Sequence, residues 1–381
     1  MTIRPARLHL VRPEVAAELA EVGYESLTPD NAARLRRLAS DGAFVRPAEP
    51  TYVAYQLAAG GHRQTGVVVE VALNAYRDGR IRAHEATDPE RVRRLGGVLA
   101  ATRLELVPLT LAHDPCPELR TALAEVSARD PDVRVTTDRV DQAAWVVRDA
   151  ETAHAIREAL SSTSTLYIAD GHHRIAAAEH FAGEHAEDGG PDGSGSVDYV
   201  LGALFPWDEV RILGYHRAVE RPLGRSADDL VAAIVAQAAV AGVEDTGDEA
   251  PRPEPGSVAM RLDRRWYRIR LRPASESTGP RESLDLAIFE AAVLGDALDM
   301  PDATADPRVE PVPGTVDPTA LERRCAEREE IGFLFHPPST AQVRAVSDAG
   351  QVMPRKATWF DPKARTGPFL RDLTAVATSD G

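Results

Sequence analysis

The sequence predicts a mixed α/β fold, and three observations support this prediction. Short apolar runs rich in β-branched residues, typical of strands, alternate along the chain with segments whose apolar residues recur at helical spacing. Hydrophobic residues make up 43% of the 381-residue chain and charged residues 27%, which is the composition of a folded protein. The 28 prolines and 27 glycines indicate many turns between the elements.

The first part of the chain carries a clear hairpin pattern. The strand-like runs TYVAYQL (Thr51 to Leu57) and TGVVVEVAL (Thr65 to Leu73) are separated by a segment that contains Gly-Gly, which predicts two paired strands. Further elements follow in this order: a strand-like stretch at 73–81, a helix at 90–103, an extended stretch at 105–112, a helix at 116–128, a strand at 143–149 and a helix at 149–160.

The later part of the chain repeats the alternation. We expect a second hairpin at 257–263 and 265–273, helices at 284–300 and 320–330, and a buried strand at 331–337. Three polar stretches rich in Gly, Pro and Asp predict surface loops at 186–198, 244–257 and 272–283. From the density of loops we expect two regions, an N-terminal α/β region at 1–220 and a C-terminal α/β region at 221–381.

Charge and cysteine content exclude several classes of protein. The chain has 44 Lys and Arg against 59 Asp and Glu, a net charge of −15, which disfavours nucleic-acid and membrane-surface partners. Its two cysteines have no metal-site or disulfide-framework spacing. Because no apolar run reaches the length of a membrane span, we expect a cytoplasmic protein. The oligomeric state is not predicted.

The densest chemical signal is the segment STLYIADGHHRIAAAEHF. An apolar run ends at Asp170-Gly171, and a strong helix former begins at Arg174, which predicts a strand, a tight turn and a helix. The N–H groups at such a helix start favour an anion, phosphate above all. Gly171 permits close approach of the backbone, and His172, His173 and Arg174 add donors.

Two other interpretations of this segment remain open. Asp170 alone could be a helix N-cap and Gly171 a turn residue, although that leaves the adjacent His-His-Arg unexplained. Two histidines and a carboxylate could also bind zinc or iron. Consecutive helical residues diverge by about 100°, so at most one of His172 and His173 would converge with Asp170 on a metal ion.

Two further segments contain candidate functional residues. His84 and Glu85 stand in a loop before a helix start, where catalytic side chains are often presented. The chain has only two lysines, Lys356 and Lys363, and both lie in MPRKATWFDPKARTG, where Trp359 adds a flat apolar surface. An ammonium is a compact charge with a tunable pKa, so this segment could bind a phosphorylated or carboxylated ligand. The alternative is a solvated loop glutamate and a cationic rim around core aromatics.

Taken together, LYIADGHHRIAAA, IRAHEAT, LGYHRAV and MPRKATWFDPKARTG resemble the bacterial and archaeal domain of unknown function family 1015. The resemblance runs in order from about Thr51 to Leu370. That family is distantly similar to the ParB/sulfiredoxin superfamily and to its free-serine kinases, which implies a nucleotide-binding core of that type with an additional α/β C-terminal region. His172 replaces the redox cysteine of sulfiredoxin-like enzymes, which excludes their chemistry, and no basic helix-turn-helix supports a DNA-segregation role.

The resemblance implies phosphoryl transfer from ATP or ADP, with Mg2+, to a small hydroxylated metabolite, most simply an amino acid such as serine. In that interpretation Gly171, His172, His173 and Arg174 hold the phosphates. Asp170 would be a magnesium ligand or a base, and His172 would also assist the chemistry.

On the acceptor side, the same resemblance implies Glu85 as the residue that deprotonates or orients the hydroxyl. His84, Lys356, Lys363 and Trp359 would then bind the acceptor or neutralise developing charge.

Two alternatives belong to other classes. One is a regulator that binds a nucleotide without turnover. The other is a metal-dependent hydrolase built on His84, Glu85, Asp170 and either His172 or His173.

Overall fold

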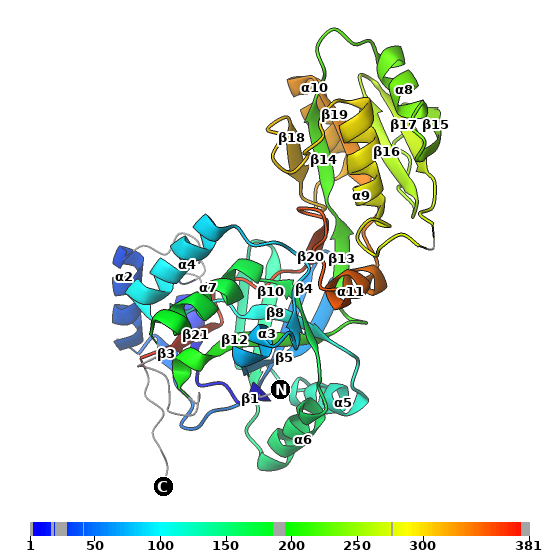
Figure 1. Ribbon diagram of the computed structural model, residues 1–381. Helices are drawn as coiled ribbons and strands as arrows, with labels where there is room; N and C mark the ends of the chain where they lie inside the picture. Colours follow the sequence, from blue (N-terminus) through cyan, green and yellow to red (C-terminus); the bar gives the residue numbers. More distant parts are fainter. Residues whose placement is uncertain are drawn as a thin grey trace. The chain divides into compact units, whose positions relative to one another are not determined.

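The computed structural model of the chain describes residues 3–16, 19, 29–40, 42–185, 195–275 and 277–374. The chain divides into two compact units. The first unit comprises residues 1–83, 87–211 and 361–381, and the second comprises residues 84–86 and 212–360 (Figure 1). This division differs from the expected regions 1–220 and 221–381, because residues 84–86 join the second unit and the C-terminal segment returns to the first.

A nine-stranded sheet forms the centre of the first unit as far as the chain is described. The expected hairpin is confirmed, because two of its strands pair from Val53 opposite Val68 to Ala59 opposite His62 around Gly60 and Gly61. The strand order along the sheet is β6 (Ile81–Arg82), β11 (Leu166–Asp170), β8 (Leu109–His113), β12 (Tyr199–Pro206), β5 (His62–Ala72), β4 (Val53–Ala59), β10 (Val140–Val146) and β9 (Val133–Thr137), and β1 (Ile3–Arg4) also pairs with β5.

Both faces of this sheet are covered, which explains the nearly continuous apolar sequence of β5. Val67 and Val69 belong to one hydrophobic cluster, whereas Val68, between them, belongs to a second cluster on the opposite face. The first cluster includes side chains of the helices α5 (Pro117–Val126), α6 (Ala150–Ser161) and α7 (His172–Glu184). The second includes side chains of a four-stranded sheet, in the order β3 (Phe44–Val45), β2 (His9–Val11), β21 (Phe369–Asp372) and β7 (Leu104–Glu105).

A buried charge network ties the C-terminal segment to the first unit. Arg371 on β21 is 1% exposed, and its guanidinium bonds to the carboxylates of Glu70 and Glu105. Arg4 bonds to the second oxygen of Glu70 at 2.7 Å. Burial raises the pKa of Glu70, but Arg371 and Arg4 lower it overall. Local sequence patterns do not reveal partners so far apart in the chain. The sequence analysis therefore did not predict that the C-terminal segment joins the first unit.

Among the described residues, the remaining elements of the first unit are three short helical segments and two longer helices. Leu73 to Ile81, expected as strand-like, instead contains a helical turn, because the N–H groups of Tyr76 and Arg77 bond to Leu73 O. The elements are η1 (Pro13–Val15), α2 (Pro29–Ser40), α3 (Asn74–Arg77), α4 (Pro89–Thr102) and η4 (Ser196–Asp198).

The second unit is built on a six-stranded antiparallel sheet of described residues. The expected second hairpin is confirmed in its two central strands. The order is β15 (Val240–Gly247), β17 (Arg265–Leu271), β16 (Ser257–Leu262), β19 (Glu330–Phe335), β14 (His216–Glu220) and β18 (Val309–Val312). A separate two-stranded sheet pairs β13 (Arg211–Gly214) with β20 (Thr358–Asp361).

Helices and loops of the second unit follow the expectations in part, because two expected segments differ in form and the described helices at 227–235 and 340–348 were not predicted. The expected helix at 284–300 is α9 (Asp285–Phe289) followed by a π-helix, η5 (Glu290–Ala297). The start of the expected loop at 244–257 belongs to β15, because it pairs with β17. The other helices are α8 (Ala227–Val235), α10 (Pro318–Arg328) and α11 (Thr340–Asp348). Most of the expected loop at 186–198 lies outside the described residues.

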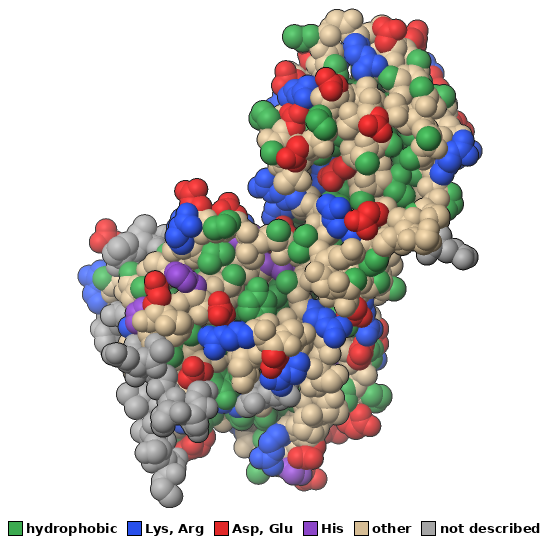
Figure 2. Space-filling model, in the orientation of Figure 1, with side chains coloured by type: hydrophobic (Ala, Val, Ile, Leu, Met, Phe, Trp, Pro, Cys, Tyr) green, Lys and Arg blue, Asp and Glu red, His purple; other side chains and the backbone are tan. Residues whose placement is uncertain are grey.

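The mixed α/β class is therefore confirmed in both units. On the face shown in Figure 2, acidic and basic side chains lie interspersed on each unit. Within the described ranges, no helix combines the length and apolar character that crossing a bilayer requires.

Candidate functional site

The predicted strand, turn and helix at the DGHHR segment are confirmed. β11 ends at Asp170, and α7 begins at His172. Gly171 between them has φ +106°, a conformation that L side chains rarely adopt, and a Cβ there would lie 2.7 Å from Leu109 Cδ2. The N–H groups of Arg174 and Ile175 both bond to Gly171 O, which closes the first turn of the helix. We call the turn formed by residues 170–174 the phosphate corner, after the ligand that the sequence analysis predicts.

The carboxylate of Asp170 holds two cations at this corner. Its Oδ1 accepts a hydrogen bond from Lys363 Nζ at 2.6 Å, and its Oδ2 accepts one from Arg174 Nη2 at 2.7 Å. Burial raises the pKa of Asp170, but the attraction of Lys363 and Arg174 outweighs it and holds the pKa below its ordinary value. Asp170 is therefore charged at neutral pH, and the three groups together carry one net positive charge.

Buried amides hold the segment that carries Lys363. Gln142 Oε1 accepts from Arg365 N at 3.0 Å, and Tyr55 donates its hydroxyl to the same oxygen. Gln64 Nε2 donates to Pro362 O at 3.4 Å. These residues lie on the central sheet, so they place the ammonium beside a residue 193 positions away in sequence. Sequence reasoning missed them because a buried glutamine in a strand has no local signature.

The other predicted phosphate ligands differ in what they contact. Arg174 Nη1 donates to Val107 O at 2.9 Å and to Pro108 O at 2.7 Å, so this guanidinium braces the corner as well as pairing with Asp170. His173 Nε2 accepts from the N–H of Asp88, the N-cap of α4, at 3.0 Å. His172 is buried. The structure thus gives Arg174 and His173 internal contacts that the sequence did not predict.

The geometry at Asp170 does not fit the expected magnesium ligand. Both carboxylate oxygens already accept from cationic groups, which would repel a divalent ion. Among the described residues no group of three or more His, Cys, Asp or Glu side chains could hold a metal ion. The hydrolase alternative therefore gains no support from the structure.

One polar group beside the corner was not predicted at all. Thr110 on β8 lies directly opposite Asp170 in the strand register. Its hydroxyl is buried and has no hydrogen-bond partner among the described side chains and backbone. A buried hydroxyl without a partner costs free energy, so its presence here needs a reason beyond packing.

The second unit contains the other predicted residues. Lys356 Nζ lies 3.7 Å from Glu85 Oε1. His84 is buried, and its Nε2 lies 3.1 Å from Thr358 Oγ1. Trp359 packs edge-on against Tyr215 with ring centroids 5.5 Å apart. Glu85, His84, Trp359 and Lys356 are therefore brought together, whereas Lys363 belongs to the first unit.

Arg217, in the motif LGYHRAV, holds the backbone that carries Lys356. Arg217, 2% exposed, donates to Arg355 O at 2.8 Å and to Lys356 O at 3.1 Å. It also pairs with Glu290 at 3.1 Å. These bonds hold Lys356 at φ +54°, which a lysine adopts only when its surroundings enforce it. Arg217 is thus a positioning residue that the sequence did not single out.

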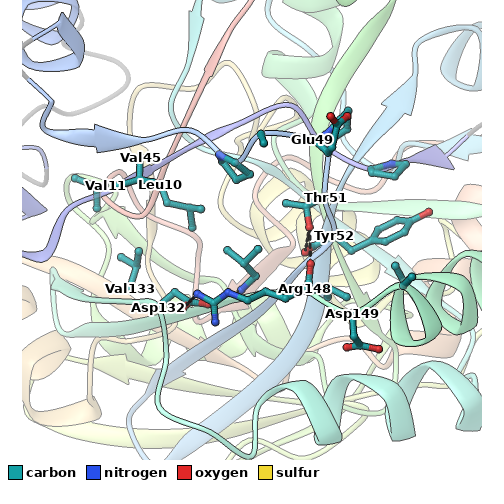
Figure 3. A pocket seen from close by; sticks show the side chains of 18 of the residues that line it. Leu10, Val11, Val45, Glu49, Thr51, Tyr52, Asp132, Val133, Arg148 and Asp149 are labelled. Atoms are coloured by element: carbon teal, nitrogen blue, oxygen red, sulfur yellow. Dashed lines mark hydrogen bonds and ion pairs between the residues drawn. The ribbon is translucent and has the colours of Figure 1, made fainter. Parts of the chain in front are cut away.

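A larger pocket lies elsewhere in the first unit and contains none of the predicted site residues. It has a volume of about 990 Å3, and Leu10, Val11 and Val133 form part of its apolar wall (Figure 3). Two of its charged side chains pair with each other, since Arg148 bonds to Asp132 at 2.6 Å.

Comparison with known proteins places the chain in a family. Residues 4–287 match the family described as "Protein of unknown function (DUF1015)". The chain belongs to this family. The resemblance to this family is therefore confirmed; DGHHR lies within the matched residues, and MPRKATWFDPK lies beyond them.

The chain is also similar to several solved structures. One, titled "SbnI with C-terminal truncation from Staphylococcus aureus", is 12% identical with a TM-score of 0.42, and the match covers 82% of this chain and 90% of that one. Another, "Free serine kinase in complex with AMP", is 14% identical with a TM-score of 0.36, covering 80% and 91%. A conserved hypothetical protein from Pyrococcus furiosus is 13% identical with a TM-score of 0.38, covering 81% and 96%. No curated protein matches the chain.

Proposed function

We propose that this protein is a phosphotransferase that moves a phosphoryl group from ATP or ADP to a small hydroxylated metabolite, an amino acid such as serine being the leading candidate. One observation carries the proposal: an ammonium, Lys363, is held 2.6 Å from Asp170 at the turn where β11 hands over to the 13-residue helix α7. A helix N-terminus with an adjacent ammonium is a site for phosphate.

The charges of the phosphate corner support an anionic ligand. Asp170 neutralises only one of the two cations that it holds, so the cluster keeps one positive charge in a chain of net charge −15. We assign phosphate binding to Lys363 and to the backbone at Gly171, with His172 and His173 beside it. Arg174 and Asp170 act as positioning residues, because their contacts fix the turn and the ammonium.

The proposed reaction is a displacement at the terminal phosphorus of the nucleotide. The acceptor oxygen forms a bond to phosphorus, the bond from phosphorus to the bridging oxygen of the leaving nucleotide breaks, and the hydroxyl proton goes to a base. Negative charge grows on the transferred group and the leaving oxygen, and Lys363 would stabilise it there. Magnesium enters only as the ion that accompanies the nucleotide phosphates, where its usual ligands are phosphate oxygens and water.

On the acceptor side we propose Glu85 as the base. Its Oε1 lies 3.7 Å from Lys356 Nζ, longer than a hydrogen bond. Lys356 would bind an anionic group of the acceptor, and Trp359 and the buried His84 would shape its surroundings.

The test supplies labelled ATP or ADP with magnesium and a pool of free amino acids, then searches for a phosphorylated product by mass. We expect one product, which Asp170→Asn abolishes or strongly reduces. Asp78→Asn, which breaks only the exposed pair with Arg80, is the matched control and should keep full turnover. Equal turnover in Asp170→Asn and the unaltered protein would refute the assignment of the corner.

The same experiment separates the two alternatives. Nucleotide binding by calorimetry without any phosphorylated product across amino acids and polyols would identify a regulator. Stoichiometric zinc or iron in the purified protein, with activity lost on chelation and no need for nucleotide, would identify a hydrolase.

A further inference from the structure

A cavity of about 310 Å3 in the second unit has no role in the proposal so far. Apolar side chains form most of its wall, among them the buried Phe335 and Met353. Besides Ser339, whose hydroxyl caps α11, three polar side chains share the lining: Asp285, His336 and Gln342. An apolar cavity of this size with a few convergent polar groups is the usual form of a small-molecule site.

Asp285 lines this cavity and has one acceptor oxygen to spare. It begins α9, and its Oδ2 accepts from Gly256 N at 2.8 Å. Across the part of the chain that the structure describes, Oδ1 has no hydrogen bond and no ion pair. Burial raises the pKa of Asp285, and the nearby His336 opposes this in part. A carboxylate withdrawn from water in this way gains most from a cationic donor, which would restore the lost solvation.

The other two polar groups can serve a different part of a ligand. Gln342 Oε1 accepts from Ser339 N at 2.9 Å in the capping box of α11, which fixes the amide. Its Nε2 and the ring of His336 have no hydrogen-bond partner in the described ranges. An amide N–H and an imidazole recognise a hydroxyl or a carboxylate.

The cavity adjoins the Glu85–Lys356 pair within the same unit. Met353 and Ala357, which line the cavity, flank Lys356 in the chain. Tyr215 also lines it, and Lys356 Nζ lies 5.9 Å from the centroid of the Tyr215 ring. A ligand in this cavity would therefore lie next to the residues that we assign to the acceptor.

We propose that this cavity binds a small molecule that carries an ammonium group together with a hydroxyl or carboxylate, such as an amino acid or an amino alcohol. The ammonium pairs with Asp285, and Gln342 and His336 bind the other polar group. That this ligand is the phosphoryl acceptor rests on the proposed function, but its binding does not.

The test measures binding to the full chain without nucleotide, by calorimetry, with L-serine and ethanolamine as probes. N-acetyl-L-serine and ethylene glycol are the matched probes without an ammonium. We expect Asp285→Asn to weaken binding of L-serine or ethanolamine about ten-fold or more, the range for a hydrogen bond to a charged group. Asp248→Asn, an exposed carboxylate of the same unit, should bind like the unaltered protein.

The probes without an ammonium guard against a variant that fails to fold, because they are tested on the unaltered protein. Equal affinity for L-serine and N-acetyl-L-serine, or unchanged affinity in a folded Asp285→Asn, would overturn the proposal. So would no binding of either amine. Binding that depends on Asp285, without any phosphorylated product in the turnover assay, would support this binding site and refute the proposed kinase activity.

Discussion

Replacing Lys363 by methionine removes the ammonium of the phosphate corner while it keeps most of the side-chain length. The variant leaves Asp170 with Arg174 as its remaining ion pair. In the folded protein the Lys363 side chain is 24% exposed and the Asp170 side chain is 25% exposed, so this ion pair lies between the surface and the interior. Exposed pairs contribute about 0–1 kcal/mol, and breaking a buried one costs about 3–5 kcal/mol. We expect Lys363→Met to lower the free energy of unfolding by about 1–2 kcal/mol.

The effect on nucleotide binding should be larger than the effect on stability. If Lys363 donates to a phosphate, its loss removes a charge-assisted hydrogen bond worth about 1.5–3 kcal/mol, which corresponds to about ten- to a hundred-fold in Kd. Calorimetry with ADP and ATP measures this ratio, and urea denaturation of the same preparation measures the stability. Lys363→Arg is the matched control, because it keeps the charge and should retain most of the affinity.

An unchanged Kd in a folded Lys363→Met protein would refute the placement of phosphate at this corner. The pH dependence provides an independent readout. Because the folded pKa of Asp170 lies below its ordinary value of 3.8, its contribution to stability is present above that pH and is lost as the pH falls. In Lys363→Met the folded pKa rises toward the ordinary value. The difference in unfolding free energy between pH 6 and pH 3 should therefore shrink, and an unchanged difference would contradict the ion pair.

Three further predictions concern the frame of the first unit. Arg371→Met leaves two buried carboxylates without their shared cation and should cost about 3–5 kcal/mol in urea denaturation, whereas Arg77→Met, which breaks an exposed pair, should change stability by less than about 1 kcal/mol. Gly171→Ala should destabilise by about 1–3 kcal/mol, because alanine resists φ +106° and its Cβ meets a leucine; a neutral effect would disprove the turn. Thr110→Val removes the unpartnered hydroxyl at constant shape, so thermal unfolding should show a gain of about 1 kcal/mol, and a loss would reveal an unseen partner.

Local patterns predicted much of the fold because they act between near neighbours. The hairpin around Gly60 and Gly61 and the turn at Gly171 were both expected, and the structure confirms them. Segments whose structure depends on packing or pairing were less predictable. The stretch after Leu73 forms a helical turn rather than a strand, and Glu244 extends β15 because it pairs with a neighbouring strand.

The candidate site divides in the same way. Local sequence and the family resemblance together singled out Asp170, Glu85 and the two lysines. Their partners could not be predicted, because the sequence contains nothing that pairs Lys363 with Asp170 or Lys356 with Glu85. The residues that hold these partners in place, such as the buried Gln142, look in the sequence like any polar residue within a strand.

The sequence by itself determined the family, the α/β class and the strand, turn and helix around Gly171, since each of these follows from the order and chemistry of adjacent residues. Only the tertiary structure decided that Lys363 returns to the first unit while Lys356 stays in the second, and that Asp285 faces a cavity with a spare oxygen. Such contacts join residues far apart along the chain, and they form only where the packing of whole sheets and helices places them within reach.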